Sequence, residues 1–214
     1  MAYNFKGGAT IATSFDYVEI ATGRGIKKFY GGDTASGASI VLSSTTFYSD
    51  QGMSSSAINT AATYNFDLEL ARPMDISDTA IVNVPVLLCV NASGGSPKTH
   101  VYTTAAKVSE GTEELLASGA SYCDGGGLAA NLAEPYMVAT SFEIPRTHYK
   151  AGDTLRLKIE TEAPGINSAV CIGHDPMNRD IPDWDKKNNC GSSSGGWGTS
   201  PTILTFHVPI VIDI

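Results

Sequence analysis

The sequence predicts an all-β protein, an antiparallel β-sandwich of the jelly-roll type, and three observations lead to this prediction. First, apolar and polar residues alternate over short segments: in Thr154–Thr161, Leu155, Leu157 and Ile159 alternate with polar residues, and a period of two is typical of a half-buried strand. Second, turn-forming Gly, Pro, Asn and Asp separate these segments at short intervals. Third, no stretch of useful length carries the 3.6-residue period of an amphipathic helix.

The expected strands follow one another after a small, polar N-terminal segment. Met1–Thr13 is interpreted as an arm, and residues 14–214 as a single domain, because no linker or break in composition divides them. The strands are segments that alternate cleanly or are rich in β-branched and aromatic residues. In chain order they are Ser14–Ile20, Ile26–Tyr30, Ser39–Tyr48, Tyr64–Leu70, Ala80–Val90, Thr99–Val108, Glu113–Ser118, Met137–Ile144, Thr154–Thr161, Ala169–Ile172 and the closing stretch Thr202–Ile214.

Two connections matter for the topology. Glu113–Ser118 either forms a hairpin with the preceding strand over Glu110-Gly111 or forms a single helical turn. Gln51–Thr63 and His174–Ser200 carry no period and are expected to be loops. A jelly roll fits this number of strands together with several long loops.

Composition and charge exclude several classes of function. Only 17% of the 214 residues are charged, and the net charge is −8. Such a chain lacks the clustered Lys and Arg that bind phosphate backbones, so nucleic acid is not an expected partner. No window approaches the roughly 18 consecutive apolar residues of a membrane helix, and the first residues do not resemble a signal peptide. We therefore expect cytoplasmic synthesis and no contact with a membrane.

The four cysteines lack the CxxC spacing of zinc and redox motifs. Cys89 and Cys171 lie in apolar stretches and are expected to be buried. Cys123 and Cys190 lie in Gly-rich segments, where a bridge between them stays open as an alternative. Cytoplasmic synthesis does not favour that bridge.

No motif predicts catalysis, so the sequence predicts that the protein is not an enzyme. A GxSxG nucleophile elbow is absent, and Gly125–Gly127 lacks the Lys-Ser/Thr of a phosphate loop. Cys123 has no basic neighbour in sequence that would lower its pKa. The four histidines share no metal-ligand spacing and are each expected to be structural or surface residues: His100, His148, His174 and His207.

The long loop before the last strand carries the only candidate ligands. Its carboxylates suit Ca²⁺, which prefers oxygen ligands, but Asp residues beside Pro also form ordinary turns. No cofactor is therefore expected, with calcium as the alternative. The candidate ligands are Asp175, Asp180, Asp183 and Asp185.

Two tryptophans in the same loop, Trp184 and Trp197, suggest an alternative function. Aromatic rings present large apolar surfaces, and lectin domains are among the jelly rolls. Two exposed rings would therefore form a platform for a sugar. The same side chains, together with Phe5 in the N-terminal arm, are also candidates for a contact between subunits.

Several stretches together resemble a known group of proteins. IKKFYGG, VLSSTTFYS, YNFDLEL, YKAGDTLRLKIET, IGHDPMNRD and HVPIVID, between Ile26 and Ile214, are similar to virion structural proteins of tailed bacteriophages and environmental viruses. This group includes capsid decoration, or cement, proteins with β-sandwich or jelly-roll folds. The resemblance implies location in a virion after synthesis in the host cytoplasm, and it implies no particular site residues.

The sequence therefore predicts a decoration protein on the outside of a phage-like shell, with a carbohydrate-binding module as the alternative. The expected partners are the major capsid protein or other virion proteins. Because exposed sheet edges must be covered or paired, we also expect a closed homo-oligomer, and a trimer would match a three-fold position of a shell. The N-terminal arm is expected to order on a neighbouring subunit.

Overall fold

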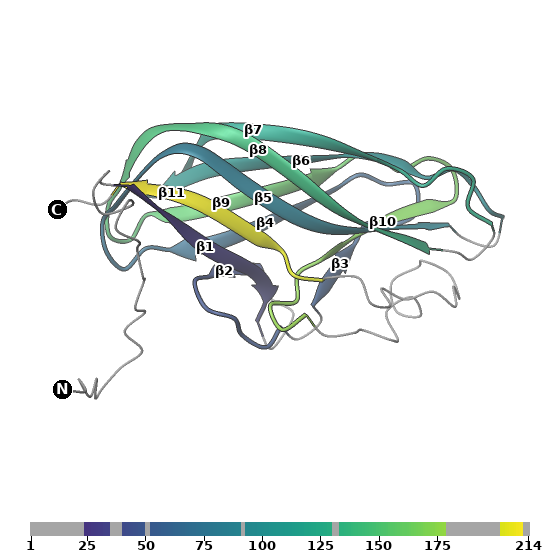
Figure 1. The fold of residues 1–214 in the computed structure, drawn as a ribbon, viewed down its shortest axis with the longest axis horizontal. Coiled ribbons are helices and arrows are strands. Elements are labelled where there is room, and N and C mark those ends of the chain that lie inside the picture. The colour runs from purple at the N-terminus through teal and green to yellow at the C-terminus, as the bar shows by residue number, and fades with distance from the viewer. Residues whose placement is uncertain are drawn as a thin grey trace.

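The computed structural model describes residues 24–34, 40–49, 52–90, 93–129, 133–178 and 202–211. These residues form eleven strands and no helix, so the all-β prediction is confirmed. Figure 1 shows the strands running along an elongated molecule. In chain order they are β1 (Arg24–Asp33), β2 (Ile40–Ser43), β3 (Met53–Ser55), β4 (Ala62–Glu69), β5 (Met74–Val90), β6 (Lys98–Ser109), β7 (Thr112–Asp124), β8 (Ala133–Tyr149), β9 (Thr154–Thr161), β10 (Ser168–Gly173) and β11 (Thr205–Val211).

The strands form one sheet that folds over on itself around a shared core. Their order is β3-β10-β5-β11-β1-β2-β4-β9-β6-β7, and β8 pairs with β5. β5 is the central strand: β8 pairs with it along its length, while β11 and β10 share its other side. Every ladder is antiparallel except a single parallel bridge between Val41 and Asp67, which joins β2 to β4. This topology is compatible with the predicted sandwich.

Strand alternation builds the core as the sequence predicted. Leu155, Leu157 and Ile159 of β9 are fully buried, and they face Phe66 and other apolar residues in the same hydrophobic cluster. Burying each such side chain contributes about 1.5–3 kcal/mol. The described part of the chain contains no helix long and apolar enough to cross a membrane.

The two ends of the folded sheet, β7 and β8, meet at a seam without a backbone ladder among the described residues. Side chains of β6 and the close approach of β7 hold β8 in place instead. Thr103 of β6 and Thr140 of β8 lie 2.5 Å apart, oxygen to oxygen, and Lys107 donates to the carbonyl of His148 over 2.7 Å. Gly119 of β7 lies so close to β8 that an added Cβ would stand 2.9 Å from the Ser141 carbonyl oxygen. The seam therefore covers two strands that would otherwise be open edges.

The structure corrects several predicted element boundaries. β3 lies inside the expected loop Gln51–Thr63, because pairing with β10, and not local alternation, defines it. β5 and β8 are longer than predicted. The hairpin alternative for Glu113–Ser118 is confirmed, with positive φ at Glu110 (51°) and Gly111 (79°), as a type I′ turn requires. The predicted arm lies outside the described residues.

The cysteines also differ in part from expectation. Cys89 and Cys171 are buried as predicted, with their Sγ atoms 3.8 Å apart. Cys123 is a buried residue of β7, not of a loop, and it carries a free thiol. The bridge that the sequence left open for Cys123 is therefore not formed.

Candidate functional site

Of the residues that the sequence analysis proposed for a site, only Asp175 belongs to the described part of the chain. It is fully buried directly after β10, and its carboxylate accepts a hydrogen bond from the Met177 amide over 3.1 Å. Among the described residues, no group of three or more His, Cys, Asp or Glu is placed to hold a metal ion. The calcium site stays a prediction, since the others lie outside the described residues: Phe5, Asp180, Asp183, Trp184, Asp185 and Trp197.

The structure brings together three residues that the sequence analysis did not connect. Asp33 ends β1, Ser54 lies in β3, and His174 directly follows β10. The Ser54 hydroxyl lies 2.9 Å from His174 Nε2, and His174 Nδ1 lies 3.6 Å from Asp33 Oδ1. We call these three residues the Ser54 cluster. His174 is 0% and Asp33 5% exposed, whereas Ser54 is only half-buried.

The fold positions each member of the Ser54 cluster. In the β3–β10 ladder Ser54 stands opposite Ile172, and the amide of His174 donates to the carbonyl of Gly52 over 2.8 Å, which holds His174 beside β3. The Asp33 carboxylate accepts the amide of Gly52 over 3.1 Å and a hydrogen bond from the Ser49 hydroxyl. These contacts fix the orientation of the carboxylate before any ligand binds.

Burial sets the protonation state of His174. Loss of solvent lowers the pKa of this imidazole to about 4, although the nearby Asp33 and Asp175 carboxylates act in the opposite direction. His174 is therefore neutral at pH 7. Its Nδ1 is a buried nitrogen without a hydrogen-bond partner, and the ring of Phe66 meets it edge-on at 5.6 Å between centroids.

No local motif could have revealed this cluster from the sequence. Ser54 and His174 are 120 residues apart, and Gly31-Gly32-Asp33 reads as a simple turn. Only the pairing of β3 with β10 joins them.

A second group of side chains lies on the outer face of β6 and β7. The rings of His100 and Tyr122 are 4.9 Å apart, and those of His100 and Tyr102 are 5.9 Å apart. Glu162 binds two of them, accepting from the Tyr102 hydroxyl over 2.7 Å and lying 2.8 Å from His100 Nδ1. The hydrogen bonds from His100 and Tyr102 lower the pKa of the Glu162 carboxyl. We call these four residues the aromatic cluster.

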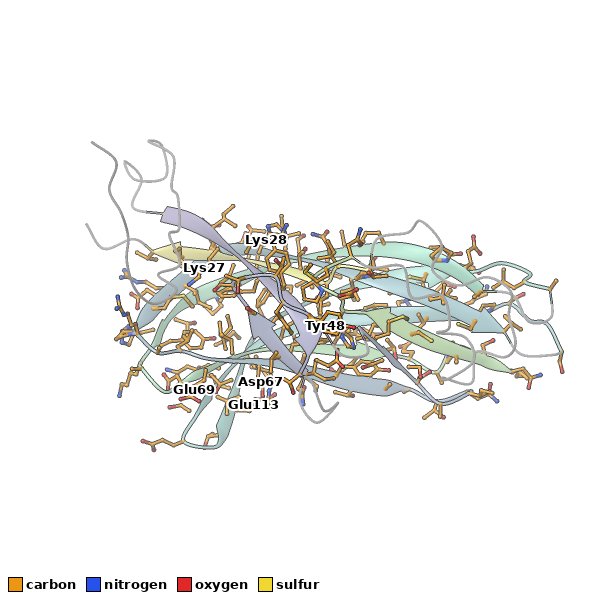
Figure 2. All side chains as sticks on the ribbon, turned by 90° about the horizontal axis from the view of Figure 1, so that it is seen from below. Lys27, Lys28, Tyr48, Asp67, Glu69 and Glu113 are labelled. Atoms are coloured by element: carbon orange, nitrogen blue, oxygen red, sulfur yellow. The ribbon has the colours of Figure 1, made fainter. Side chains whose placement is uncertain are left out.

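The outer face formed by β4, β9, β6 and β7 is rich in charge. Arg156 binds both carboxylate oxygens of Asp67 over 2.7 Å and also contacts Glu113 over 2.6 Å. Lys158 pairs with Glu160 at 3.1 Å. Figure 2 shows Asp67 and Glu113 together on the lower side of that view. A shallow, open groove of about 480 Å³ also lies here, lined by Ile40, Val41, Asn65, Asp67, Glu69 and Thr154.

The central part of the opposite outer face, formed by β8, β5, β11 and β1, is poor in charge, and the ion pairs Arg24–Asp78 and Arg146–Asp75 lie at one end of these strands. Its exposed apolar side chains are Ile26 (59%), Ile81 (44%) and Met137 (47%). The strand register brings its outward residues onto one surface, for instance in the row from Lys28 through His207 and Ile81 to Ser141. We define this charge-poor face as Ile26, Lys28, Tyr30, Thr79, Ile81, Asn83, Met137, Ala139, Ser141, Glu143, Thr205 and His207.

The two charged residues of this face are both engaged by neighbours. The ammonium of Lys28 lies 5.0 Å from the centre of the Tyr30 ring, and Glu143 accepts a hydrogen bond from the Thr79 hydroxyl over 2.8 Å. In Figure 2, Lys28 lies on the upper side of the molecule, away from Asp67 and Glu113.

No protein-family model matches the sequence, and no curated protein matches it either. Among solved structures, the chain is similar to an α-amino acid ester hydrolase, with 9% identity over 86% of this chain and a TM-score of 0.52. An aminopeptidase from a marine sediment archaeon, Thaumarchaeota archaeon, matches with 6% identity over 88% of this chain, also with a TM-score of 0.52. The chain spans 36% and 37% of the length of these two hydrolases.

A viral protein also matches, at greater structural distance. The VP2 protein of infectious bursal disease virus, in T=1 particles, covers 89% of this chain at 11% identity, and this chain spans 36% of it. The TM-score is 0.32, which is too low to support an argument about fold or function.

These comparisons correct one prediction. The sequence analysis predicted that the protein is not an enzyme, and that prediction is contradicted, because its fold recurs within hydrolases. That prediction depended on contiguous motifs in the sequence, whereas the similarity to hydrolases lies in the fold.

Proposed function

We propose that the protein is a structural subunit of a virion, a decoration protein that binds a phage-like shell as a symmetric oligomer. The charge-poor face is the observation that carries this proposal. The cores of protein interfaces are depleted in charged residues, whereas the polar rim and the free surface keep them. The central part of this sheet face, with three exposed apolar side chains and only two charged ones, Lys28 and Glu143, fits the core of an interface, and the ion pairs Arg24–Asp78 and Arg146–Asp75 beside it fit a polar rim.

The sequence resemblance to virion structural proteins supports the same proposal. A specific interface buries about 800 Å² on each partner, and four adjacent strands offer a broad surface for this. The energy of association would come from covering Ile26, Ile81 and Met137. The partners would be further copies of this chain and proteins of the shell.

A matched pair of substitutions tests the role of the charge-poor face. Ala139 and Ala120 are both exposed alanines on outer faces, in β8 and β7 respectively, but only Ala139 belongs to the charge-poor face. We expect the wild-type protein to form a closed oligomer whose mass does not change with concentration. Ala139→Arg should convert it to a monomer, because it places an unpaired charge in the interface, and Ala120→Arg should leave the oligomer intact.

The measurement is light scattering coupled to size-exclusion chromatography, with circular dichroism to verify that both variants are folded. A wild-type protein that stays monomeric at every concentration would refute the proposed oligomer. An unchanged oligomer in Ala139→Arg would show that another surface mediates assembly.

The aromatic cluster favours a second candidate function, carbohydrate binding. Tyr102 and Tyr122 are 36% and 49% exposed, and Glu162 fixes Tyr102 and His100 in place. Ordered aromatic rings beside a carboxylate offer a sugar both an apolar surface and a hydrogen-bond acceptor. This site differs from the predicted pair of tryptophans, which lie outside the described residues.

A glycan array tests this second function. We expect Tyr122→Ala to reduce glycan binding at least about tenfold, which corresponds to a loss of about 1.4 kcal/mol. Tyr48→Ala is the matched control, because Tyr48 is also an exposed tyrosine (67%) but lies outside the aromatic cluster. If the wild-type protein binds no glycan, or if both variants lose binding equally, the aromatic cluster is not a sugar site.

A further inference from the structure

We propose that the Ser54 cluster is a hydrolytic site in which Ser54 is the nucleophile, His174 the general base and Asp33 the carboxylate that orients His174. The substrate class would be carboxylic esters with a good leaving group. This activity goes beyond the proposed structural role and does not depend on it.

The three side chains have the arrangement that nucleophilic catalysis requires. A nucleophile must lie within hydrogen-bonding reach of a base, and a third group must orient that base. Ser54 Oγ lies 2.9 Å from His174 Nε2. The other ring nitrogen, Nδ1, faces Asp33 Oδ1 at 3.6 Å, a distance that catalytic hydrogen bonds often show before substrate binds.

The surroundings of His174 leave one ring nitrogen poorly satisfied. Buried side-chain nitrogens nearly always have a hydrogen-bond partner, yet Nδ1 of His174 has none with good hydrogen-bond geometry, although the backbone of Met53 and of His174 itself also acts on the imidazole. The group that faces it is a carboxylate already held by Gly52 and Ser49. A small movement of the ring would complete the contact, and a proton on Nδ1 would leave Nε2 free to accept the Ser54 proton.

Access and charge stabilisation come from the position of Ser54 in an edge strand. Ser54 is half-buried, whereas His174 and Asp33 are buried, so a substrate would reach the cluster from the side of Ser54. The amide of Ser56 donates to Val170 and the carbonyl of Gly52 accepts from His174. Even-numbered residues of β3 therefore point their backbone groups toward β10. The amide of Ser55 faces away from β10, one residue after Ser54, and is the proposed donor to a developing oxyanion.

The reaction follows from these positions. Ser54 Oγ forms a bond to the ester carbonyl carbon while its proton passes to His174 Nε2, and the carbonyl electron pair moves onto oxygen. The intermediate collapses, the bond to the alcohol oxygen breaks, and the alcohol takes the proton from Nε2. Water then attacks the acyl-serine, gives a proton to Nε2 and releases the carboxylic acid, and Ser54 regains its proton.

The decisive experiment uses the full chain and a biotinylated fluorophosphonate, which forms a covalent bond to activated serines. Peptide mass mapping should find the adduct on Ser54, and Ser54→Ala should remove it. Ser55→Ala is the matched control, because it changes the neighbouring serine and keeps the amide. It should keep the adduct on Ser54. Turnover of p-nitrophenyl acetate by the same proteins should fall at least about 100-fold in Ser54→Ala.

Asp33→Asn and His174→Gln test the relay behind Ser54. Both should reduce labelling of Ser54 at least tenfold in protein that circular dichroism shows to be folded, because an unassisted serine hydroxyl is a weak nucleophile. If either variant fails to fold, the comparison of Ser54→Ala with Ser55→Ala still decides the proposal. An unlabelled Ser54 in the wild-type protein would overturn it, as would equal labelling of Ser54 and Ser55.

Discussion

At the scale of single residues, His174 lies in an environment very different from that of a free amino acid. It is completely buried, it lies between a hydroxyl and a carboxylate, and burial lowers its pKa from 6.5 to about 4. A histidine that must stay neutral in the folded state couples folding to pH. The same neutrality is what the proposed base requires.

The stability of the protein should therefore fall as the medium becomes acidic. Between the unfolded pKa of 6.5 and the folded pKa of about 4, the unfolded chain binds a proton at His174 that the folded chain does not. Full stability is expected above pH 6.5, with a loss of up to about 1.4 kcal/mol per pH unit below it. Urea unfolding at several pH values measures this slope.

Two comparisons isolate His174 in that experiment. His174→Gln should flatten the slope, whereas His207→Gln, at a histidine with smaller burial and a pKa that is also lowered, should retain most of it. Asp153 should affect the free energy of unfolding only at more acidic pH. Hydrogen bonds, led by the one from the Lys150 amide, lower its pKa to about 2. An unchanged slope in His174→Gln would show that His174 is not the responsible group.

At the scale of elements, the seam between β7 and β8 determines how the sheet closes. Backbone hydrogen bonds do not join these strands among the described residues, so the seam depends on close approach at Gly119 and on the contact between Thr103 and Thr140. A tightly packed contact tolerates a shift of its side chains less well than an exposed surface position does. A small steric change at the seam should consequently affect the whole fold.

Gly119→Ala tests the seam directly. The new Cβ would stand 2.9 Å from the Ser141 carbonyl oxygen and 3.2 Å from Cδ1 of Phe142, so β7 or β8 must shift. We expect a loss of about 1–3 kcal/mol in the free energy of unfolding, measured with urea. Gly127→Ala is the control, because nothing lies within 4 Å of its added Cβ. Equal effects of the two substitutions would mean that the seam accommodates a Cβ at position 119 without destabilising the fold.

At the scale of the whole molecule, the two outer faces divide the surface into different chemical environments. One face carries the ion pairs around Arg156 and the aromatic cluster, and the central part of the other is poor in charge. The Ser54 cluster lies where β1, β3 and β10 come together. Ala139→Arg tests an assembly contact on the charge-poor face. The Ser54 cluster does not belong to that face, so its substitutions test it separately.

The sequence by itself determined the all-β class, most of the strands and the core positions, because alternation with a period of two is a local property of the chain. The hairpin over Glu110-Gly111 is local in the same sense, since the turn needs two residues with positive φ. The sequence did not predict β3, which has no alternation of its own and exists because it pairs with β10.

Only the tertiary structure decided which residues meet. Asp33, Ser54 and His174 come from three separate strands or strand ends, and the charge-poor face arises from the register of β8, β5, β11 and β1. Long-range pairing is set by the total burial of one sheet face, and a one-residue slip would turn every side chain to the other side. No short stretch of sequence contains that information, so the candidate site and the candidate interface both became visible only in the folded chain.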